Sequence, residues 1–327
     1  MKPIIPAIQL QQLHADTLPA WLHLTSPLLR SYANAALGIN GPDSNNFIAL
    51  ALEGESREQI GLLLAEVMDW PTKNEAAAQR LCIHSLCVAK PYRRQGLGRL
   101  LLTQSQQWAI AHHLSGLHMP VPLQSQSSEA LLTLTATKGG WTSTPGKVVV
   151  RLSVSATVET LLQRLELVVE RQSRNASWQI APFPKSPTTA FQERITKAEQ
   201  ADIATPLDLD QESLPWQPAV DYSRIVRSEG QIIGWLITHY VSDDCLRYAK
   251  FWVDPGWEHT GAPLAMLASV MRSAHFSEST NVIPKGCFIS HPSNQPLHHW
   301  VEKQFKPVSD SWCQIENRDL LFQQPQE

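Results

Sequence analysis

Val88-Ala-Lys-Pro-Tyr-Arg-Arg-Gln-Gly-Leu-Gly-Arg-Leu-Leu-Leu102 joins an apolar segment to a leucine-rich one, with arginines and glycines crowded between them. The apolar segment predicts a strand that ends at Val88, and the leucine spacing predicts a helix that begins near Gly96. Glycine lets the backbone approach a ligand closely, and the free N–H groups of a first helical turn attract negative charge. The junction therefore predicts a cradle for an anion such as a pyrophosphate. The alternative is a solvated basic turn whose glycines only allow close packing.

The patterns on either side of this junction predict alternating strands and helices. In the first half we expect strands over 47–52, 60–68, 81–88, 117–123 and 148–154, and helices over 18–32, 96–113 and 127–138. An amphipathic helix over 158–171 follows. Beyond it we expect strands over 178–180, 221–227, 231–240, 245–253 and 287–290, helices over 189–200, 261–275 and 295–304, and a last strand that begins at Trp312. A hairpin, a strand, a helix, a strand and a helix follow one another twice, which indicates a duplication.

The composition is that of a globular protein of two domains, since 327 residues exceed the roughly 150 of an average domain. The net charge of −3 gives no electrostatic footprint for nucleic acid. No apolar run approaches the ~18 residues of a membrane span. The five cysteines are scattered without a Cys-x-x-Cys pair, which favours a reducing compartment and argues against a zinc site. We expect a cytoplasmic protein with no metal, no nucleic-acid partner and no membrane association.

Three pieces of the junction together form a known motif: Leu86-Cys87-Val88, Pro91-Tyr92-Arg93-Arg94-Gln95-Gly96-Leu97-Gly98 and Leu100-Leu101. They resemble the acetyl-coenzyme A motif of the GNAT N-acetyltransferase superfamily, whose signature is Gln/Arg-x-x-Gly-x-Gly/Ala. The resemblance implies a mixed, mostly antiparallel central sheet flanked by helices. It also implies that acetyl-coenzyme A is the co-substrate and that an amine attacks its thioester directly.

The resemblance assigns the cofactor-binding residues to two stretches and one further position. The strand end would pair with the pantetheine arm, the loop N–H groups would bind the pyrophosphate, and one serine falls near a conserved asparagine of the family. These residues are Leu86, Cys87, Val88, Arg93, Arg94, Gln95, Gly96, Leu97, Gly98, Arg99 and Ser127.

His84 is the first candidate for the catalytic base. The alternation of side chains along a strand places it on one face with Leu86 and Val88. Arylalkylamine acetyltransferases have a histidine at this offset, so the resemblance implies a role in proton transfer. Glu66 on the neighbouring strand is the second candidate. The alternatives are a structural core histidine and an ordinary hairpin carboxylate that faces solvent.

The sequence departs from the family at the general acid. The family usually has a tyrosine four residues before a Gly-Phe pair, and that tyrosine protonates the leaving thiolate. Here Gly140-Trp141 stands for the pair, and Ala136 occupies the position of the tyrosine. The thiolate would then take its proton from water or from another group.

The second copy of the junction has lost the features of a cradle. After the strand that ends at Val253 the chain reads Glu258-His259-Thr260-Gly261-Ala262-Pro263. An acid replaces the arginines, and Pro263 removes one N–H group. We expect this copy not to hold coenzyme A.

These observations predict an α/β (α+β) protein of two GNAT-like domains. We expect a cofactor-binding domain over 1–156, a connector helix over 157–176 and a degenerate domain over 177–327. The expected activity is acetyl-coenzyme A-dependent transfer of an acyl group to a small-molecule amine. The alternatives are a coenzyme A-binding regulatory or scaffold protein with little activity, and an acetyltransferase that acts on proteins. Whether the chain forms a homodimer stays open.

Overall fold

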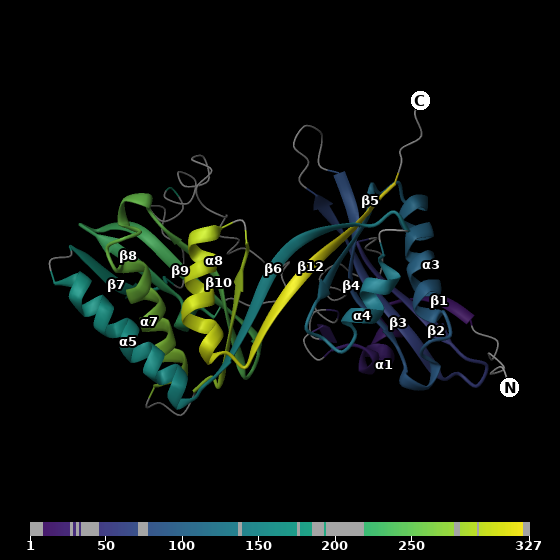
Figure 1. Cartoon of the computed structure of the whole chain (residues 1–327), viewed down its shortest axis with the longest axis horizontal. Helices are drawn as coiled ribbons and strands as arrows, with labels where there is room; N and C mark the ends of the chain where they lie inside the picture. The colour runs from purple at the N-terminus through teal and green to yellow at the C-terminus, as the bar shows by residue number, and fades with distance from the viewer. Residues whose placement is uncertain are drawn as a thin grey trace. The chain divides into compact units, whose positions relative to one another are not determined.

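The computed structural model describes residues 9–26, 29–30, 33, 46–70, 78–136, 139–174, 177–184, 193, 219–277, 282–292 and 294–322. Among these residues, unit 1 comprises 9–146 and 314–322, and unit 2 comprises 147–313. Two strands, β6 (Thr142–Ser153) and β12 (Ser311–Leu321), each run from one unit into the other (Figure 1). This division differs from the expected boundaries at 156 and 177. The helix expected over 189–200 lies outside the described residues except for Glu193.

Unit 1 is a mostly antiparallel sheet with helices on both faces. Its sheet order is β1-β2-β3-β4-β5-β12-β6; β4 and β5 run parallel, whereas β1, β2, β3 and β4 pair antiparallel in succession and β12 pairs antiparallel with β5. Its remaining elements are β1 (Gln9–Leu13), α1 (Leu18–Trp21), η1 (Leu22–Leu24), β2 (Phe47–Glu53), β3 (Gln59–Trp70), β4 (Ala78–Val88), η2 (Lys90–Tyr92), α3 (Leu97–Ala111), β5 (Gly116–Pro122) and α4 (Ser128–Leu134). The expected strands and the helix after the junction are confirmed to within a few residues. The helix expected over 18–32 is wrong in its extent, because the backbone turns extended at Thr25.

Two apolar clusters hold the faces of this sheet. Leu97 and Leu101 of α3 pack on β2, β3 and β4 in the first cluster, here called the α3 face. Leu18 and Trp21 of α1 pack on the opposite face in the second cluster, here called the α1 face. Each cluster draws alternate residues from the same strands, as expected for a sheet covered on both sides.

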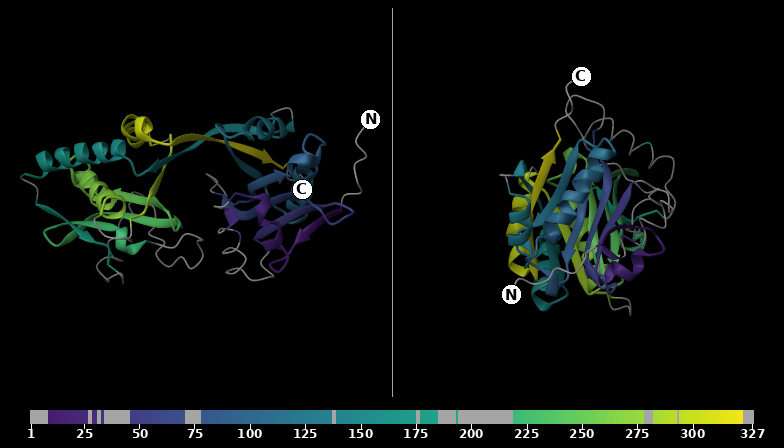
Figure 2. Two further views of the ribbon diagram at one scale, coloured as in Figure 1. Left: turned by 90° about the horizontal axis from the view of Figure 1, so that it is seen from below. Right: turned by 90° about the vertical axis from the view of Figure 1, so that its right-hand side faces the viewer.

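Unit 2 repeats this arrangement. Its sheet order is β12-β6-β11-β10-β9-β8-β7, with β10 and β11 parallel. Its elements besides β6 and β12 are α5 (Ala156–Ser173), β7 (Trp178–Pro182), η4 (Val220–Tyr222), β8 (Arg224–Ser228), β9 (Gln231–Ser242), β10 (Cys245–Val253), η5 (Pro255–Trp257), α7 (Ala262–His275), β11 (Lys285–Ser290), α8 (Gln295–Phe305) and η6 (Lys306–Val308). Helices α5 and α7 lie side by side on the same face (Figure 2), where their apolar residues share one core with the sheet.

The end of the chain completes the sheet of unit 1. Strand β12 pairs with β5 over the whole length of that strand, from Ile315 opposite Pro122 to Leu321 opposite Gly116. Oδ1 of Asp319 on β12 accepts from Arg80 Nη1 at 2.9 Å and contacts His118 Nδ1 at 3.0 Å. The three side chains are 14%, 13% and 9% exposed, so this cluster is largely removed from water.

We predict that Asp319→Asn destabilises the protein by about 3 kcal/mol, because it leaves the largely buried Arg80 guanidinium without its charge partner. Urea denaturation followed by circular dichroism measures this loss. Asp244→Asn is the matched control, since Asp244 pairs with Lys285 at the surface, and it should leave the stability almost unchanged. Equal midpoints for Asp319→Asn and the unaltered protein would contradict the prediction.

Candidate active site

The cradle expected from the sequence is present at the start of α3. Gly96 precedes the helix with φ at +83°, in the left-handed region that favours glycine. A Cβ at Gly96 would meet nothing within 4 Å, so the space beside this turn is open. The N–H group of Leu100 is the first in this helix to donate a helical hydrogen bond, to the carbonyl of Gly96 at 3.0 Å. The preceding N–H groups of the first turn are therefore available to an anion.

Gly98 has a different role in the same turn. A Cβ there would lie 3.3 Å from Leu134 of α4 and 3.5 Å from Leu86 of β4. Glycine thus lets the first turn of α3 pack tightly between its neighbours. The packing interpretation therefore applies to Gly98, and the anion-binding role of Gly96 stays a prediction.

The polar residues before α3 surround this turn. Arg93 donates from Nε to the carbonyl of Val88 at 2.9 Å, which ties the loop to the end of β4. Arg94 has a left-handed backbone, with φ at +62°. Gln95 reaches back to the carbonyl of Pro91 at 3.4 Å. Arg99 is exposed on the helix and Leu97 is buried under it.

The remaining predicted cofactor residues lie on two other elements. Leu86 and Val88 pack against the α3-face cluster from β4. Cys87 lies between them, and burial raises the pKa of its thiol. Ser127 precedes α4 without capping it, and its hydroxyl lies 3.1 Å from that of Ser125.

A bulge in β4 positions His84. Ser85 pairs with Leu64 and Ile83 pairs with Ala65, so His84 is the extra residue of a bulge opposite β3. Its Nε2 lies 3.1 Å from Oε2 of Glu66. The bulge breaks the side-chain alternation, so the expectation that His84 shares a face with Leu86 and Val88 is wrong. The structure brings together the two predicted base candidates, and their side chains keep 19% and 22% exposure.

The strands β4 and β5 diverge next to this bulge. Their parallel ladder consists of Leu81 with Leu117 and Cys82 with His118, although both strands continue. Within the described residues, no strand pairs with the edge of β4 that faces β5 beyond Cys82. This edge runs from the bulge to the cradle, which is the path that the resemblance gives to the pantetheine arm.

A row of side chains on the α1 face could not be predicted from the sequence. Glu66 pairs with Cys82, Cys82 with His118, and His118 with Asp319, so these four residues lie side by side across β3, β4, β5 and β12. Trp70 flanks the row, with its ring 4.4 Å from that of His118. The row combines two carboxylates with an imidazole beside His84. No local signal reveals it, because it depends on a strand from the far end of the chain.

Thr135, the residue before Ala136, does not replace the general acid that is missing at position 136. Ala136 follows the end of α4, and the buried hydroxyl of Thr135 donates to the carbonyl of Leu131 at 2.8 Å. Thr137, which the sequence also places there, lies outside the described residues. The proton for a leaving thiolate has to come from elsewhere.

The corresponding turn of unit 2 is filled by its own chain. Gly261 precedes α7 with φ at +82°, as Gly96 precedes α3. A Cβ at Gly261 would lie 2.8 Å from Cβ and Oε1 of Gln172, so α5 occupies the space that is open in unit 1. Trp178 adds a bond from Nε1 to the carbonyl of Thr260 at 3.3 Å. Together with Pro263 in the first turn, this argues against coenzyme A binding in unit 2.

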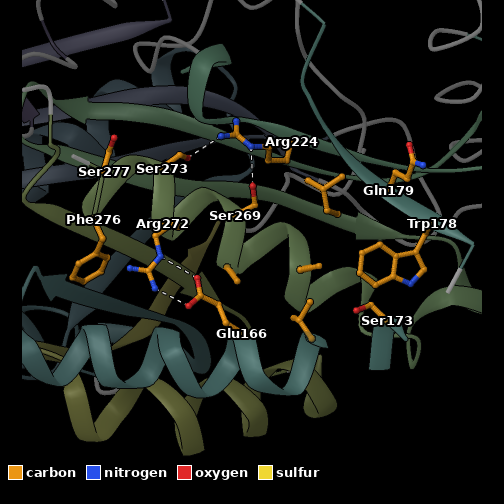
Figure 3. A pocket seen from close by; sticks show the side chains of 14 residues that line it. Glu166, Ser173, Trp178, Gln179, Arg224, Ser269, Arg272, Ser273, Phe276 and Ser277 are labelled. Atoms are coloured by element: carbon orange, nitrogen blue, oxygen red, sulfur yellow. Dashed lines mark hydrogen bonds and ion pairs between the residues drawn. The ribbon is translucent and has the colours of Figure 1, made fainter. Parts of the chain in front are cut away.

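A hollow of about 1210 Å³ lies elsewhere in unit 2, between α5, α7 and the strands β7 and β8 (Figure 3). Its two guanidinium groups have partners in the wall. Arg272 binds Glu166 through two bonds of 3.0 and 2.6 Å. Arg224 donates to the hydroxyls of Ser269 and Ser273. These side chains mainly join the elements around the hollow.

The described residues lack the features of two other classes of site, a metal site and a membrane-spanning helix. No group of three histidine, cysteine or acidic side chains that could hold a metal ion was found among them. No helix in this part of the chain is long and apolar enough to cross a membrane.

Residues 8–132 match the family model of the acetyltransferase (GNAT) family. A search of curated protein sequences found no match. Among solved structures, one similar structure is a GCN5-related glucosamine N-acetyltransferase region of a fungal multi-domain GH3 β-N-acetylglucosaminidase. Its sequence is 12% identical and its TM-score is 0.61, and the match covers 97% of this chain. The present chain spans 38% of that fungal chain. A tandem GNAT protein from the clavulanic acid biosynthesis pathway is 14% identical with a TM-score of 0.60, covering 97% of this chain and all of its own.

A third structure, a conserved protein of unknown function from Enterococcus faecalis described as a probable N-acyltransferase, has 9% identity and a TM-score of 0.52, covering 96% of this chain and 73% of its own. At such identities the likenesses establish the fold. Unit 1 is therefore a domain of the GNAT acetyltransferase family, and the whole chain has the fold of tandem GNAT proteins. The expected family and fold class are confirmed.

We predict that Gly96→Glu abolishes the protection of this protein against heat by acetyl-coenzyme A, because it places a carboxylate in the anion cradle. Gly230→Glu is the matched control, since Gly230 has φ at +80° and equally open space in a turn of unit 2. The midpoint of thermal unfolding, with and without acetyl-coenzyme A, measures the effect. The assignment of the cradle fails if Gly96→Glu keeps the full ligand-induced rise.

Proposed function

We propose that unit 1 transfers an acetyl group from acetyl-coenzyme A to the amine of a small molecule. One observation carries this proposal. The His84–Glu66 pair lies at a bulge beside the unpaired edge of β4, and that edge leads to the open cradle at Gly96. A proton acceptor, a strand edge and an anion cradle in this order are what an acyl-coenzyme A acyltransferase needs.

The residues at the cradle fit the anionic part of acetyl-coenzyme A. The first-turn N–H groups of α3 and the side chains of Arg94 and Arg99 would hold the pyrophosphate. The edge of β4 up to Val88 would bind the amide groups of the pantetheine arm, as an added strand binds a sheet edge. When bound, acetyl-coenzyme A supplies an activated acyl group as its thioester.

The pair of side chains at the bulge would prepare the amine. An amine arrives as an ammonium ion at neutral pH and has to lose a proton before it can attack. His84 can accept this proton at one ring nitrogen, while Glu66 orients the ring and stabilises the imidazolium. The carboxylate of Glu66 beside His84 favours a cationic acceptor, whereas the carboxylate of Asp319 is already paired with Arg80.

A second candidate function follows from the absence of a general acid at position 136. Ala136 has no proton to give, and the hydroxyl of Thr135 is bonded to the carbonyl of Leu131. These two residues favour a unit that binds coenzyme A without catalysis. Release of free thiol during incubation with acetyl-coenzyme A and a panel of small amines separates the two. Binding without thiol release would favour the second function over the first.

We predict that His84→Ala lowers the rate of amine acetylation by about 100-fold near pH 7. The deficit should shrink above about pH 8, because a growing fraction of the amine is then already neutral. His259→Ala is the control, since His259 is exposed in unit 2. Initial rates over a pH series measure the effect. A deficit that is the same at every pH would reject the role of His84 as the base.

A further inference from the structure

Unit 2 has the same bulge as unit 1, but with different chemistry. In unit 2 Tyr248 pairs with Thr238 and Lys250 pairs with Ile237, so Ala249 is the extra residue of β10. It corresponds to His84, the extra residue of β4. The duplicated sheet therefore keeps its backbone irregularity while the imidazole is replaced by a methyl group.

The bulges allow the two sheets to be aligned residue by residue. Arg247 pairs with His239 on β9 and with Cys287 on β11, and Cys287 pairs with Arg151 on β6. These four residues form a row across unit 2, here called the basic row. Its members occupy the positions that Glu66, Cys82, His118 and Asp319 occupy in unit 1.

The charge of the row is inverted between the two units. The ends of the row in unit 1 are the carboxylates of Glu66 and Asp319, whereas two of the four members of the basic row are the guanidinium groups of Arg247 and Arg151. A row that suits a cation in unit 1 has become one that suits an anion in unit 2.

Arg247 contributes a partly buried guanidinium to the basic row. Its Nε is buried, and no hydrogen-bond partner for this atom exists among the described residues. Burial also lowers the pKa of this guanidinium, because removal from water disfavours the charged form. Asp244, an acidic residue near the start of β10, is paired with Lys285.

The other members of the row differ in exposure. His239 and Cys287 are buried, whereas Arg151 is exposed, so a ligand can reach the Arg151 end of the row from solvent. The hydrogen bond with Cys245 and burial raise the pKa of the Cys287 thiol, and the same hydrogen bond lowers the pKa of the Cys245 thiol.

We propose that the basic row of unit 2 binds a small molecule through a carboxylate or phosphate group. Guanidinium groups bind these oxyanions through paired, charge-assisted hydrogen bonds. The site is distinct from a second acetyl-coenzyme A site, because Gln172 fills the cradle of unit 2 and Ala249 supplies no base. The proposal does not depend on the activity of unit 1.

Isothermal titration of the full chain with succinate and with inorganic phosphate tests this site. The titrations use a Gly96→Glu background, so that the cradle of unit 1 does not contribute. We expect saturable binding of at least one anion, and the preferred anion identifies the ligand group. Arg247→Gln and Arg151→Gln should each weaken binding by roughly tenfold or more.

Arg227→Gln is the matched control, because Arg227 lies on β8 of the same unit and bonds to the carbonyl of Gly230. It should leave the affinity unchanged. If Arg247→Gln does not fold, Arg151→Gln carries the test, since Arg151 is exposed. The proposal is overturned if neither anion binds, or if an anion binds equally well to the folded Arg247→Gln or Arg151→Gln protein.

Discussion

The divergence of β4 from β5 is the constraint on which the site of unit 1 depends. The ladder between these strands ends at Cys82 and His118, and the bulge at His84 follows at once on the other edge of β4. One strand segment thereby presents an unpaired edge, an imidazole held by Glu66 and, at its end, the loop to the cradle at Gly96. If β4 and β5 stayed paired beyond Cys82 and His118, β4 would lose the strand edge that a coenzyme A arm needs.

The two units of the duplication share backbone geometry and differ in side-chain chemistry. Both units have a left-handed glycine before the helix that follows the central strand, and both have a one-residue bulge in that strand. The side chains at these positions differ. Gln172 lies where unit 1 has open space, Ala249 stands for His84, Arg151 stands for Asp319, and Arg247 stands for Cys82. The shared irregularities show that unit 2 repeats the backbone architecture of unit 1, whereas the side chains at these positions differ.

The sequence predicts what is local and misses what depends on distant pairing. The cradle was predictable because glycine, arginine and leucine spacing act within one strand, loop and helix, and the order of the elements follows from the same patterns. The face of His84 was predicted wrongly, because a bulge is set by the register against β3. Asp319 could not be assigned to the site, since its contacts with Arg80 and His118 join residues from opposite ends of the chain. The filling of the second cradle by Gln172 has no local signal either.

Amide hydrogen exchange, followed by mass spectrometry with and without acetyl-coenzyme A, tests the central claim most directly. The claim is that unit 1 alone holds the acyl donor, along the edge of β4 and at the first turn of α3. We expect the ligand to slow exchange in the peptides that cover residues 83–99 and to leave those over 250–265 unchanged. Protection of residues 250–265, or an absence of protection over 83–99, would contradict the claim.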